Sequence, residues 1–483
     1  MAKDFIVAIE LGSSKITGMA GKKNPDGSIT ILAAASEDST SYIRKGVVYS
    51  IDKTTQGLSN IISKLKNSLQ ADITQVYVGI GGQSIHSVKN MVIKDLPMDA
   101  IVSQNMVNEL MDSNRNMTYP DYEIQDAITE EYKVDLQYQN DPVGIQASRL
   151  EGNFLNILWR RSFYRNLNKS FDNAGIAIAE TYLAPLVMAD NVLTEAEKRA
   201  GCVLVDLGAE TTTVSVYYRD KLRSIAVIPL GGDNITKDLE SLQMEACEAE
   251  RMKLKYSSAI TDVADIDPTA ILPIDSNRSV ESRRFIEVVE ARTLEIIENV
   301  KSFIPSEYID KLLGGIIITG GGSNMTNIEK AFREITGVEK IRIAKFVTLN
   351  INSKDSKPEL RHDGTMNTIV SLIARGDMNC AGNPFGNSLF DNQQFNAAFT
   401  TGTTNGTTTT QPNATTPHET EEERTKREEK ERIAKEEAER IKQEEETRKA
   451  KEEEERKKNS PIHRFFGSLK QFGRSLVEPE NNE

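Results

Sequence analysis

The sequence predicts an α/β fold built from two copies of a related domain, followed by a long polar tail. From residue 1 to about 390, short β-branched runs alternate with stretches of helical periodicity, which is typical of such proteins. A strand that ends in an acidic residue and a glycine turn occurs twice, at Glu10 and at Asp206. Beyond residue 390 the composition changes abruptly to Thr, Asn and Gly, and then to Glu, Lys and Arg.

Composition and charge narrow the possible functions of the chain. The net charge is -13, which argues against nucleic-acid binding as the main activity because a phosphate backbone requires clustered Lys and Arg. The three cysteines, Cys202, Cys247 and Cys380, are widely spaced and predict neither disulfides nor a zinc site. We expect no signal peptide and no bilayer-spanning helix.

The first element is the strand from Phe5 to Glu10, which leads into a Gly12-Ser13-Ser14 turn. A carboxylate beside a tight turn suits a metal-bound phosphate, because backbone N–H groups and hydroxyls face the anion while the acid holds the waters of the cation. A plain β-hairpin is the commoner explanation for one such turn.

The second element repeats this arrangement in the strand from Cys202 to Asp206, followed by Gly208 and the Thr211-Thr212 pair. The repetition predicts a duplicated domain whose two turns face each other across a cleft, where they could bind phosphates and Mg²⁺. A third element is the apolar run 316–318, which ends in three glycines at 320–322 before a helix. Glycines allow a backbone to lie flat against a purine or a sugar.

Together, in this order, these elements resemble the phosphate-1, phosphate-2 and adenosine motifs of the actin, Hsp70 and sugar-kinase superfamily, and in detail the FtsA family of bacterial cell-division actins. The helix at residues 244–253 resembles the one whose Glu and Lys flank the ribose and base. The segment 141–145, Asp-Pro-Val-Gly-Ile, resembles the Pro-Val-Gly signature of a small subdomain inserted early in that family. The resemblance implies an actin-like duplicated ATPase fold, with an inserted α+β subdomain (1C), that binds ATP and Mg²⁺.

The resemblance also assigns roles to individual residues and boundaries to subdomains. Phosphate contacts fall to Gly12, Ser13, Ser14, Lys15, Gly208, Thr211 and Thr212; nucleoside contacts to Glu250, Lys253, Gly320, Gly321 and Gly322; and water-mediated Mg²⁺ contacts to Glu10 and Asp206. The implied subdomains are 1–83 and 164–200 (1A), 84–163 (1C), 201–240 and 311–390 (2A), and 241–310 (2B).

Two residues depart from the superfamily pattern. Glu10 stands where Asp is usual, and Glu210 stands where a third glycine is usual. The longer acidic side chains could shift the metal or repel the γ-phosphate, so we expect at most weak ATPase activity and assign no catalytic residue.

The tail divides into three segments. We expect residues 391–418 to form a flexible linker, because they contain too few large aliphatic residues to offset the entropy of ordering. We expect residues 419–458 to form a charged helical spacer, because they contain many Glu-to-Lys or Glu-to-Arg pairs; a coiled coil is the alternative, but the apolar seam that it needs is missing.

Residues 460–477 predict an amphipathic helix that binds a membrane. Its apolar face consists of Ile462, Phe465, Phe466, Leu469, Phe472 and Leu476, with Arg464, Lys470 and Arg474 on or beside the polar face. An apolar face on a long tether needs a partner, and flanking cations favour an anionic lipid surface. The alternative is docking in a protein groove.

The resemblance implies a protein at the division site, on the cytoplasmic side of the inner membrane. It would tether the FtsZ ring, assemble with itself and recruit later division proteins. An actin-like scaffold of a pilus or cell-shape system is the first alternative. A small-molecule kinase of the same superfamily is the second, although no further acid-base constellation supports it.

Overall fold

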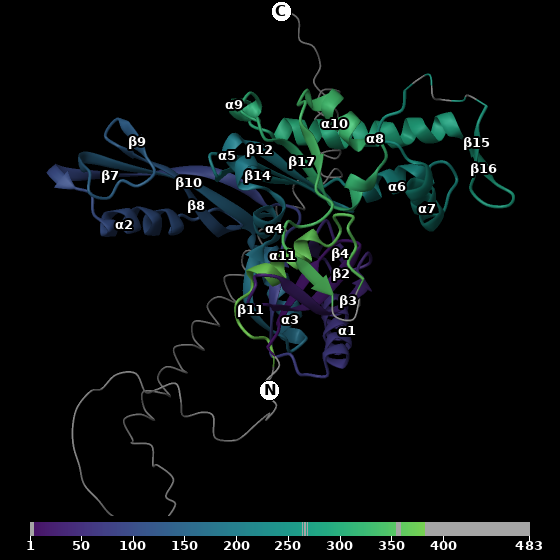
Figure 1. Ribbon diagram of the computed structural model, residues 1–483, viewed down its shortest axis with the longest axis horizontal. Helices are drawn as coiled ribbons and strands as arrows, with labels where there is room; N and C mark the ends of the chain where they lie inside the picture. The colour runs from purple at the N-terminus through teal and green to yellow at the C-terminus, as the bar shows by residue number, and fades with distance from the viewer. Residues whose placement is uncertain (1–3, 263, 265–266, 268, 354–358, 382–483) are drawn as a thin grey trace, which may run out of the picture. The chain divides into compact units, whose positions relative to one another are not determined.

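The computed structural model describes residues 4–262, 264, 267, 269–353 and 359–381, and these residues form two large sheets with helices packed against them (Figure 1). The predicted linker, charged spacer and terminal helix lie outside the described residues. No helix within the described ranges is both long enough and apolar enough to cross a bilayer.

The first sheet has six strands in the order β11-β6-β1-β2-β3-β19. Their bounds are β1 (Ile6–Leu11), β2 (Lys15–Lys23), β3 (Ile29–Asp38), β6 (Gln75–Ile80), β11 (Ala177–Leu183) and β19 (Ile351–Ser353). Helices α1 (Ile51–Leu69) and α3 (Arg161–Asn173) pack together at one face, and α4 (Ala184–Val192) and α11 (Asn367–Arg375) pack together at the other. Gly18 and Gly21 of β2 allow this close approach, since Gly18 lies against Ile61 and Gly21 against Ile373.

The second sheet has nine strands in the order β18-β17-β12-β13-β14-β7-β10-β8-β9. Its first five strands are β12 (Cys202–Leu207), β13 (Thr212–Tyr218), β14 (Lys221–Ile228), β17 (Gly315–Thr319) and β18 (Ile341–Ile343). Helices α5 (Glu195–Ala200), α9 (Ser306–Ile309) and α10 (Ile328–Thr336) belong to this part of the chain.

The two sheets repeat one topology, which confirms the predicted duplication. In the first sheet β1 pairs parallel with β6 and antiparallel with β2, and β2 pairs with β3. In the second sheet β12 pairs parallel with β17 and antiparallel with β13, and β13 pairs with β14. The registers also correspond, because Leu11 pairs with Ile16 and Leu207 pairs with Thr212 at the ends of the two hairpins.

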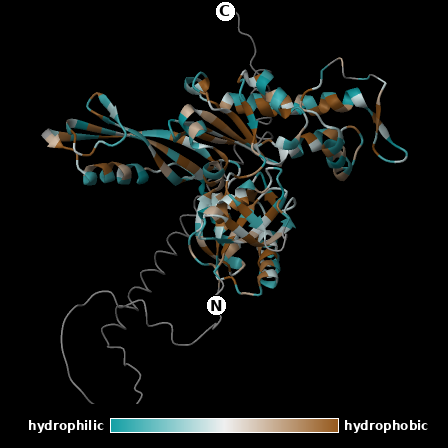
Figure 2. Ribbon diagram, viewed as in Figure 1, coloured by the Kyte–Doolittle hydropathy of each residue, from teal (hydrophilic) through white to brown (hydrophobic). Residues whose placement is uncertain are grey.

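An α+β unit is inserted between the strands of the first sheet. It consists of β7 (His86–Ile101), α2 (Gln104–Arg115), β8 (Tyr122–Val134), β9 (Gln137–Gln139) and β10 (Gln146–Arg160). Leu110, Leu150 and Phe154 lie in its own buried core. In Figure 2 the strands of both sheets carry much of the hydrophobic colour, whereas α2 is mostly hydrophilic.

The inserted unit joins the second sheet at a narrow seam. The pair Ala226 and His86 connects β14 to β7. Beside it, the buried guanidinium of Arg223 lies 3.4 Å from the buried carboxylate of Glu130, and the Lys221 ammonium donates a hydrogen bond to the Glu130 carbonyl oxygen. An ion pair buried in this way leaves an uncompensated charge if either partner is removed.

A smaller helical layer completes the second half. Its elements are α6 (Gly232–Glu240), α7 (Ala246–Tyr256), β15 (Ile271–Pro273), β16 (Ser279–Glu281) and the long helix α8 (Ser282–Phe303). Leu239, Met252 and Phe285 bring α6, α7 and α8 into one apolar cluster. Residues of α6 and α7 line one cavity together with the glycine turns that follow β12 and β17.

Candidate functional site

The first hairpin turn is tight and therefore requires glycine. The Gly12 N–H donates to the Lys15 carbonyl oxygen at 3.1 Å, and a Cβ on Gly12 would lie 2.8 Å from that oxygen. The two serines of the turn have different surroundings. Ser14 lines a cavity, whereas Ser13 is buried and its Oγ accepts a hydrogen bond from the Gly46 N–H at 2.8 Å.

The second hairpin turn reproduces this geometry. The Gly208 N–H donates to the Thr211 carbonyl oxygen at 2.9 Å, and a Cβ on Gly208 would lie 2.8 Å from that oxygen. The Thr212 hydroxyl donates to the Leu230 carbonyl oxygen at 2.9 Å, which ties the turn to the loop before α6. Thr211 acts in the turn through its backbone, and Thr212 lines the cavity.

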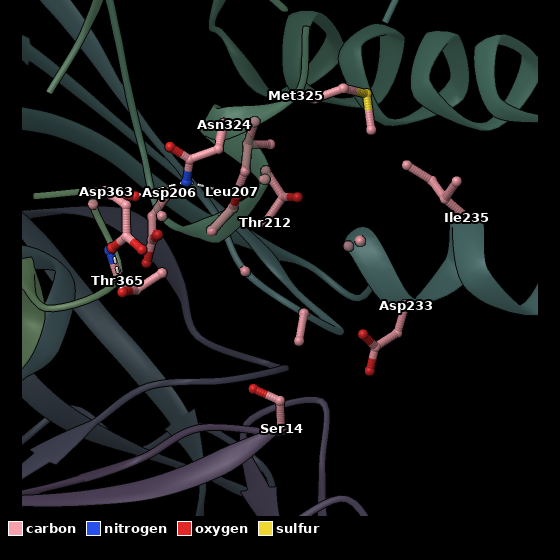
Figure 3. A pocket seen from close by; sticks show the side chains of 18 of the residues that line it. Ser14, Asp206, Leu207, Thr212, Asp233, Ile235, Asn324, Met325, Asp363 and Thr365 are labelled. Atoms are coloured by element: carbon pink, nitrogen blue, oxygen red, sulfur yellow. Dashed lines mark hydrogen bonds between the residues drawn. The ribbon is translucent and has the colours of Figure 1, made fainter. Parts of the chain in front are cut away.

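The two turns contribute to a single cavity of about 570 Å³, a size that accommodates a small-molecule ligand. Figure 3 shows Ser14 on the first hairpin facing the region occupied by Thr212 and by Asp233 at the start of α6. The predicted site residues that line the cavity are Glu10, Gly12, Ser14, Lys15, Asp206, Gly208, Thr212, Glu250, Lys253, Gly320, Gly321 and Gly322. The structure thus brings together residues that the sequence separates by hundreds of positions.

Glu10 and Asp206 contribute two carboxylates to the lining of the cavity. Burial, together with the negative charge of Asp206, raises the pKa of Glu10 to about 7, while Lys15 and a hydrogen bond from Thr368 act in the opposite direction. Burial raises the pKa of Asp206 to about 6. A cation between the two groups would relieve both effects, and oxygen ligands of this kind suit a hydrated Mg²⁺.

Lys253 is saturated with hydrogen-bond acceptors. Its Nζ donates to the Gly232 carbonyl at 3.0 Å and to the Thr236 hydroxyl at 2.8 Å, and it pairs with the Glu250 carboxylate at 2.6 Å. An ammonium has three protons; two of them hold α7 on α6 through Gly232 and Thr236, and the third pairs with Glu250 within α7. Glu250 is 41% exposed and is the member of the pair with surface open to a ligand.

The three glycines after β17 have different physical requirements. Gly320 has a φ of +81°, and a Cβ there would lie 2.3 Å from Asp206 Oδ1. A Cβ on Gly322 would lie 2.8 Å from the Leu207 Cβ. At Gly321 the nearest atom is Thr365 Cγ2 at 3.6 Å, an ordinary contact. Two of the glycines are therefore required for packing against β12, and Gly321 is the one with room beside it.

Sequence reasoning missed one loop that lines the cavity, Gly231-Gly232-Asp233. The Gly232 N–H donates to the Gly208 carbonyl at 3.0 Å, and the Asp233 N–H donates to the Ala209 carbonyl at 2.7 Å. Burial raises the pKa of the Asp233 carboxyl. A Gly-Gly pair between a strand and a helix start is the signal that could have identified this loop.

A second missed set lies among the last residues that the structure describes. Asp363, Thr365 and Thr368 line the cavity, and the Asn324 amide donates to the Asp363 carbonyl oxygen at 2.8 Å (Figure 3). No local motif marks these residues, because only tertiary packing brings them to the glycine turn.

Comparisons with known proteins agree with this architecture. A family model described as "Cell division protein FtsA" matches residues 203–361, and one described as "SHS2 domain inserted in FTSA" matches residues 82–158. The chain is 32% identical over 352 residues to the cell division protein FtsA of Porphyromonas gingivalis. The aligned region covers 71% of this chain and 74% of that protein. It is 29% identical to the FtsA of Neisseria meningitidis, covering 71% of this chain and 88% of that protein.

Among solved structures, the chain is similar to a PilM-PilN type IV pilus biogenesis complex, with 14% identity and a TM-score of 0.53 over 77% of this chain and 98% of that chain. This similarity concerns the fold alone. The actin-like duplicated fold with an inserted α+β subdomain, expected from the sequence, is confirmed. From these matches and the shared architecture, the chain belongs to the FtsA family, the actin-like proteins of cell division.

Proposed function

We propose that the cleft binds ATP together with Mg²⁺. The observation that carries this proposal is the convergence of two equivalent hairpin turns, from the two halves of the duplicated fold, on a single cavity that is lined by a half-buried carboxylate from each half. Gly-rich turns beside carboxylates suit a metal-bound phosphate chain.

The residues of the cleft would divide the nucleotide between them. Gly12, Ser14 and Lys15 would meet the phosphates from one half, and Gly208 and Thr212 from the other. Lys15 adds a positive charge that also favours the ionised form of Glu10. Mg²⁺, when bound, supplies the positive charge that offsets the phosphates and both carboxylates.

The nucleoside would lie at the opposite end of the cavity. Glu250 offers carboxylate surface to ribose hydroxyls, and Gly321 offers open backbone. Figure 3 shows Met325 and Ile235 pointing toward one another across this end, where apolar side chains would contact a base. Turnover is proposed to be weak at most, because Glu10 and Glu210 depart from the superfamily pattern.

We further propose that the ATP-bound protein assembles with itself and tethers the FtsZ ring to the cytoplasmic side of the inner membrane at the division site, where it recruits later division proteins. Membership of the FtsA family supports this role. The amphipathic pattern of residues 460–477 supports attachment to an anionic lipid surface.

The test is recruitment of fluorescent FtsZ polymers to anionic lipid vesicles by the full chain with Mg-ATP. We expect recruitment by the full chain and none by a chain that ends at residue 459, although both versions should bind ATP equally in calorimetry. Equal recruitment by the two chains would contradict the tethering role. Absence of measurable ATP binding in the full chain would contradict the nucleotide assignment.

A further inference from the structure

A two-residue turn lies between the two halves of the cleft. Lys45 and Gly46 connect β4 (Ile43–Arg44) to β5 (Val47–Val48), and both have positive φ, 50° and 72°. Two consecutive positive φ angles define the type I′ hairpin turn. Glycine adopts this conformation readily, but lysine does so rarely, so Lys45 depends on its surroundings to stay there.

The backbone N–H groups of this turn donate hydrogen bonds to the two hairpin turns that line the cleft. The Gly46 N–H donates to Ser13 Oγ in the first hairpin at 2.8 Å. The Lys45 N–H donates to the Glu210 carboxylate in the second hairpin at 2.6 Å. Successive N–H groups in such a turn form a concavity that favours an anion, and a charge-assisted hydrogen bond of this kind is stronger than a neutral one.

Glu210 is well placed to hold this contact. Its side chain is 19% exposed, and its second oxygen lies 3.4 Å from the exposed Lys237 ammonium. Glu210 also lies within the turn between Gly208 and Thr212, both of which line the cavity. A movement of that turn therefore moves the carboxylate that holds Lys45.

The other side of the turn leads to the inserted subdomain. The Lys45 carbonyl oxygen accepts a hydrogen bond from the Gln83 N–H at 2.8 Å, and the Gln83 carbonyl oxygen accepts one from the Trp159 indole at 3.2 Å. Backbones are in direct contact here, since a Cβ on Gly46 would lie 2.5 Å from the Gly82 Cα. Trp159 is fully buried near the end of β10, where the inserted subdomain meets the first sheet.

We propose that Glu210, the Lys45–Gly46 turn and Gln83 form a relay that couples ligand binding in the cleft to the root of the inserted subdomain at Trp159. The proposal rests on the proposed nucleotide binding, because that binding is what would move the relay. The hydrogen bonds of the relay are present in the structure without a nucleotide. The Lys45 N–H and C=O are both hydrogen-bonded, so the turn connects Glu210 on one side to Gln83 on the other. Glu210 is thus a positioning residue that acts through Lys45.

Trp159 makes the relay directly measurable, because it is the single tryptophan of the chain. Mg-ATP is titrated into the full chain while tryptophan emission is recorded, and binding is measured separately by calorimetry. In the unchanged protein we expect emission to change with the calorimetric midpoint. In Glu210→Ala we expect the emission change to be lost even at Mg-ATP concentrations that calorimetry shows to be saturating for that variant.

Two matched variants show which property of Glu210 matters. Glu210→Gln keeps an acceptor oxygen for the Lys45 N–H and should retain most of the emission change. Lys237→Met removes only the exposed partner of Glu210 and should retain all of it. A full emission change in Glu210→Ala, or a silent Trp159 in unchanged protein that binds ATP, would overturn the relay.

A second measurement needs no nucleotide and separates the relay from the proposed function. Hydrogen exchange at the Gln83 amide should be about tenfold faster in Glu210→Ala, the effect expected for losing one charge-assisted hydrogen bond that holds its acceptor, Lys45. Lys237→Met should exchange as the unchanged protein does. Unaltered exchange in a folded Glu210→Ala protein would refute the relay, whereas absence of ATP binding in the unchanged protein would refute only the proposed function.

Discussion

Glu10 and Asp206 bring two negative charges to the same part of the cleft, and burial disfavours the ionised form of both. Each residue comes from the same position of a repeated hairpin, so the duplication itself creates the pair. Electrostatic repulsion makes the pair unfavourable without a ligand and attractive to a cation. These two residues therefore determine the affinity of the site for a cation.

Replacing Asp206 tests the metal assignment. Asp206→Ala should weaken Mg-ATP affinity by about a hundredfold, because a charged metal contact is worth roughly 3 kcal/mol at a partly buried site. Calorimetry in Mg²⁺ and in EDTA measures the effect. Asp220→Ala, which changes an exposed carboxylate in the next hairpin, is the matched control and should bind normally. Unchanged affinity in Asp206→Ala would remove Asp206 from the site.

Glu10 should make the stability of the metal-free protein depend on pH. Its pKa in the folded protein, about 7, is above the ordinary value of 4.5, so the folded state binds more protons than the unfolded state between these values. The free energy of unfolding should therefore fall as pH rises from about 4 to about 7, by up to about 3 kcal/mol. Asp206, with a pKa raised to about 6, acts in the same direction.

The corresponding measurement is denaturant unfolding in EDTA between pH 5 and pH 8. Glu10→Gln should flatten the decline and leave the protein more stable than the unchanged chain at pH 8. Glu287→Gln, an exposed carboxylate on α8, should leave the curve as it was. A curve for Glu10→Gln that matches the unchanged protein would contradict the raised pKa.

At the scale of elements, the sequence predicts best what is decided locally. The two hairpins were recognisable because a tight turn needs glycine at Gly12 and Gly208, whatever the rest of the chain does. The position of Asp363 was not predictable, because packing across the cleft places it there. The saturation of Lys253 was not predictable either, since its acceptors on α6 become neighbours only after folding.

The glycine turn after β17 provides a prediction at this scale. Gly320→Ala should lower the free energy of unfolding by about 1–3 kcal/mol, because it combines a positive φ with a Cβ placed against Asp206. Gly321→Ala is the control in the same turn and should change stability by less than about 0.5 kcal/mol, since its Cβ meets only an ordinary contact. Thermal unfolding distinguishes the two. Equal destabilisation by both variants would mean that the turn is constrained in another way.

At the scale of the whole molecule, the predicted architecture separates nucleotide binding from lipid binding. The cleft lies within residues 10–368, whereas the predicted membrane helix follows 391–418 and 419–458. A change in one part should therefore leave the other intact.

The terminal helix provides the corresponding prediction. Replacing Phe465 and Phe472 with Glu should abolish vesicle binding, because each buried aromatic contributes about 1.5–3 kcal/mol and each new charge would face lipid. Replacing Arg464, Lys470 and Arg474 with Gln should weaken binding only partly, and mainly on anionic vesicles at low salt.

Vesicle sedimentation measures the lipid binding of both variants. Their ATP affinity, measured in parallel, is the control that the region containing the cleft is still folded. If the double Glu variant pelleted with vesicles as a folded monomer, the membrane assignment of residues 460–477 would be wrong and docking in a protein groove would replace it.

The seam between β14 and β7 has a mechanical consequence. Within the inserted subdomain, β7 and β10 share a ladder that extends from His86 to Ile101. The seam has far fewer bonds, among them the pair Ala226 and His86, the hydrogen bonds between Ser87 and Ile225, and the contacts of Arg223 and Lys221 with Glu130. A pulling force breaks the contact with the fewest bonds first. A pulling force on the inserted subdomain should therefore open the seam first and detach the subdomain as an intact body, before any of its own strands unravel.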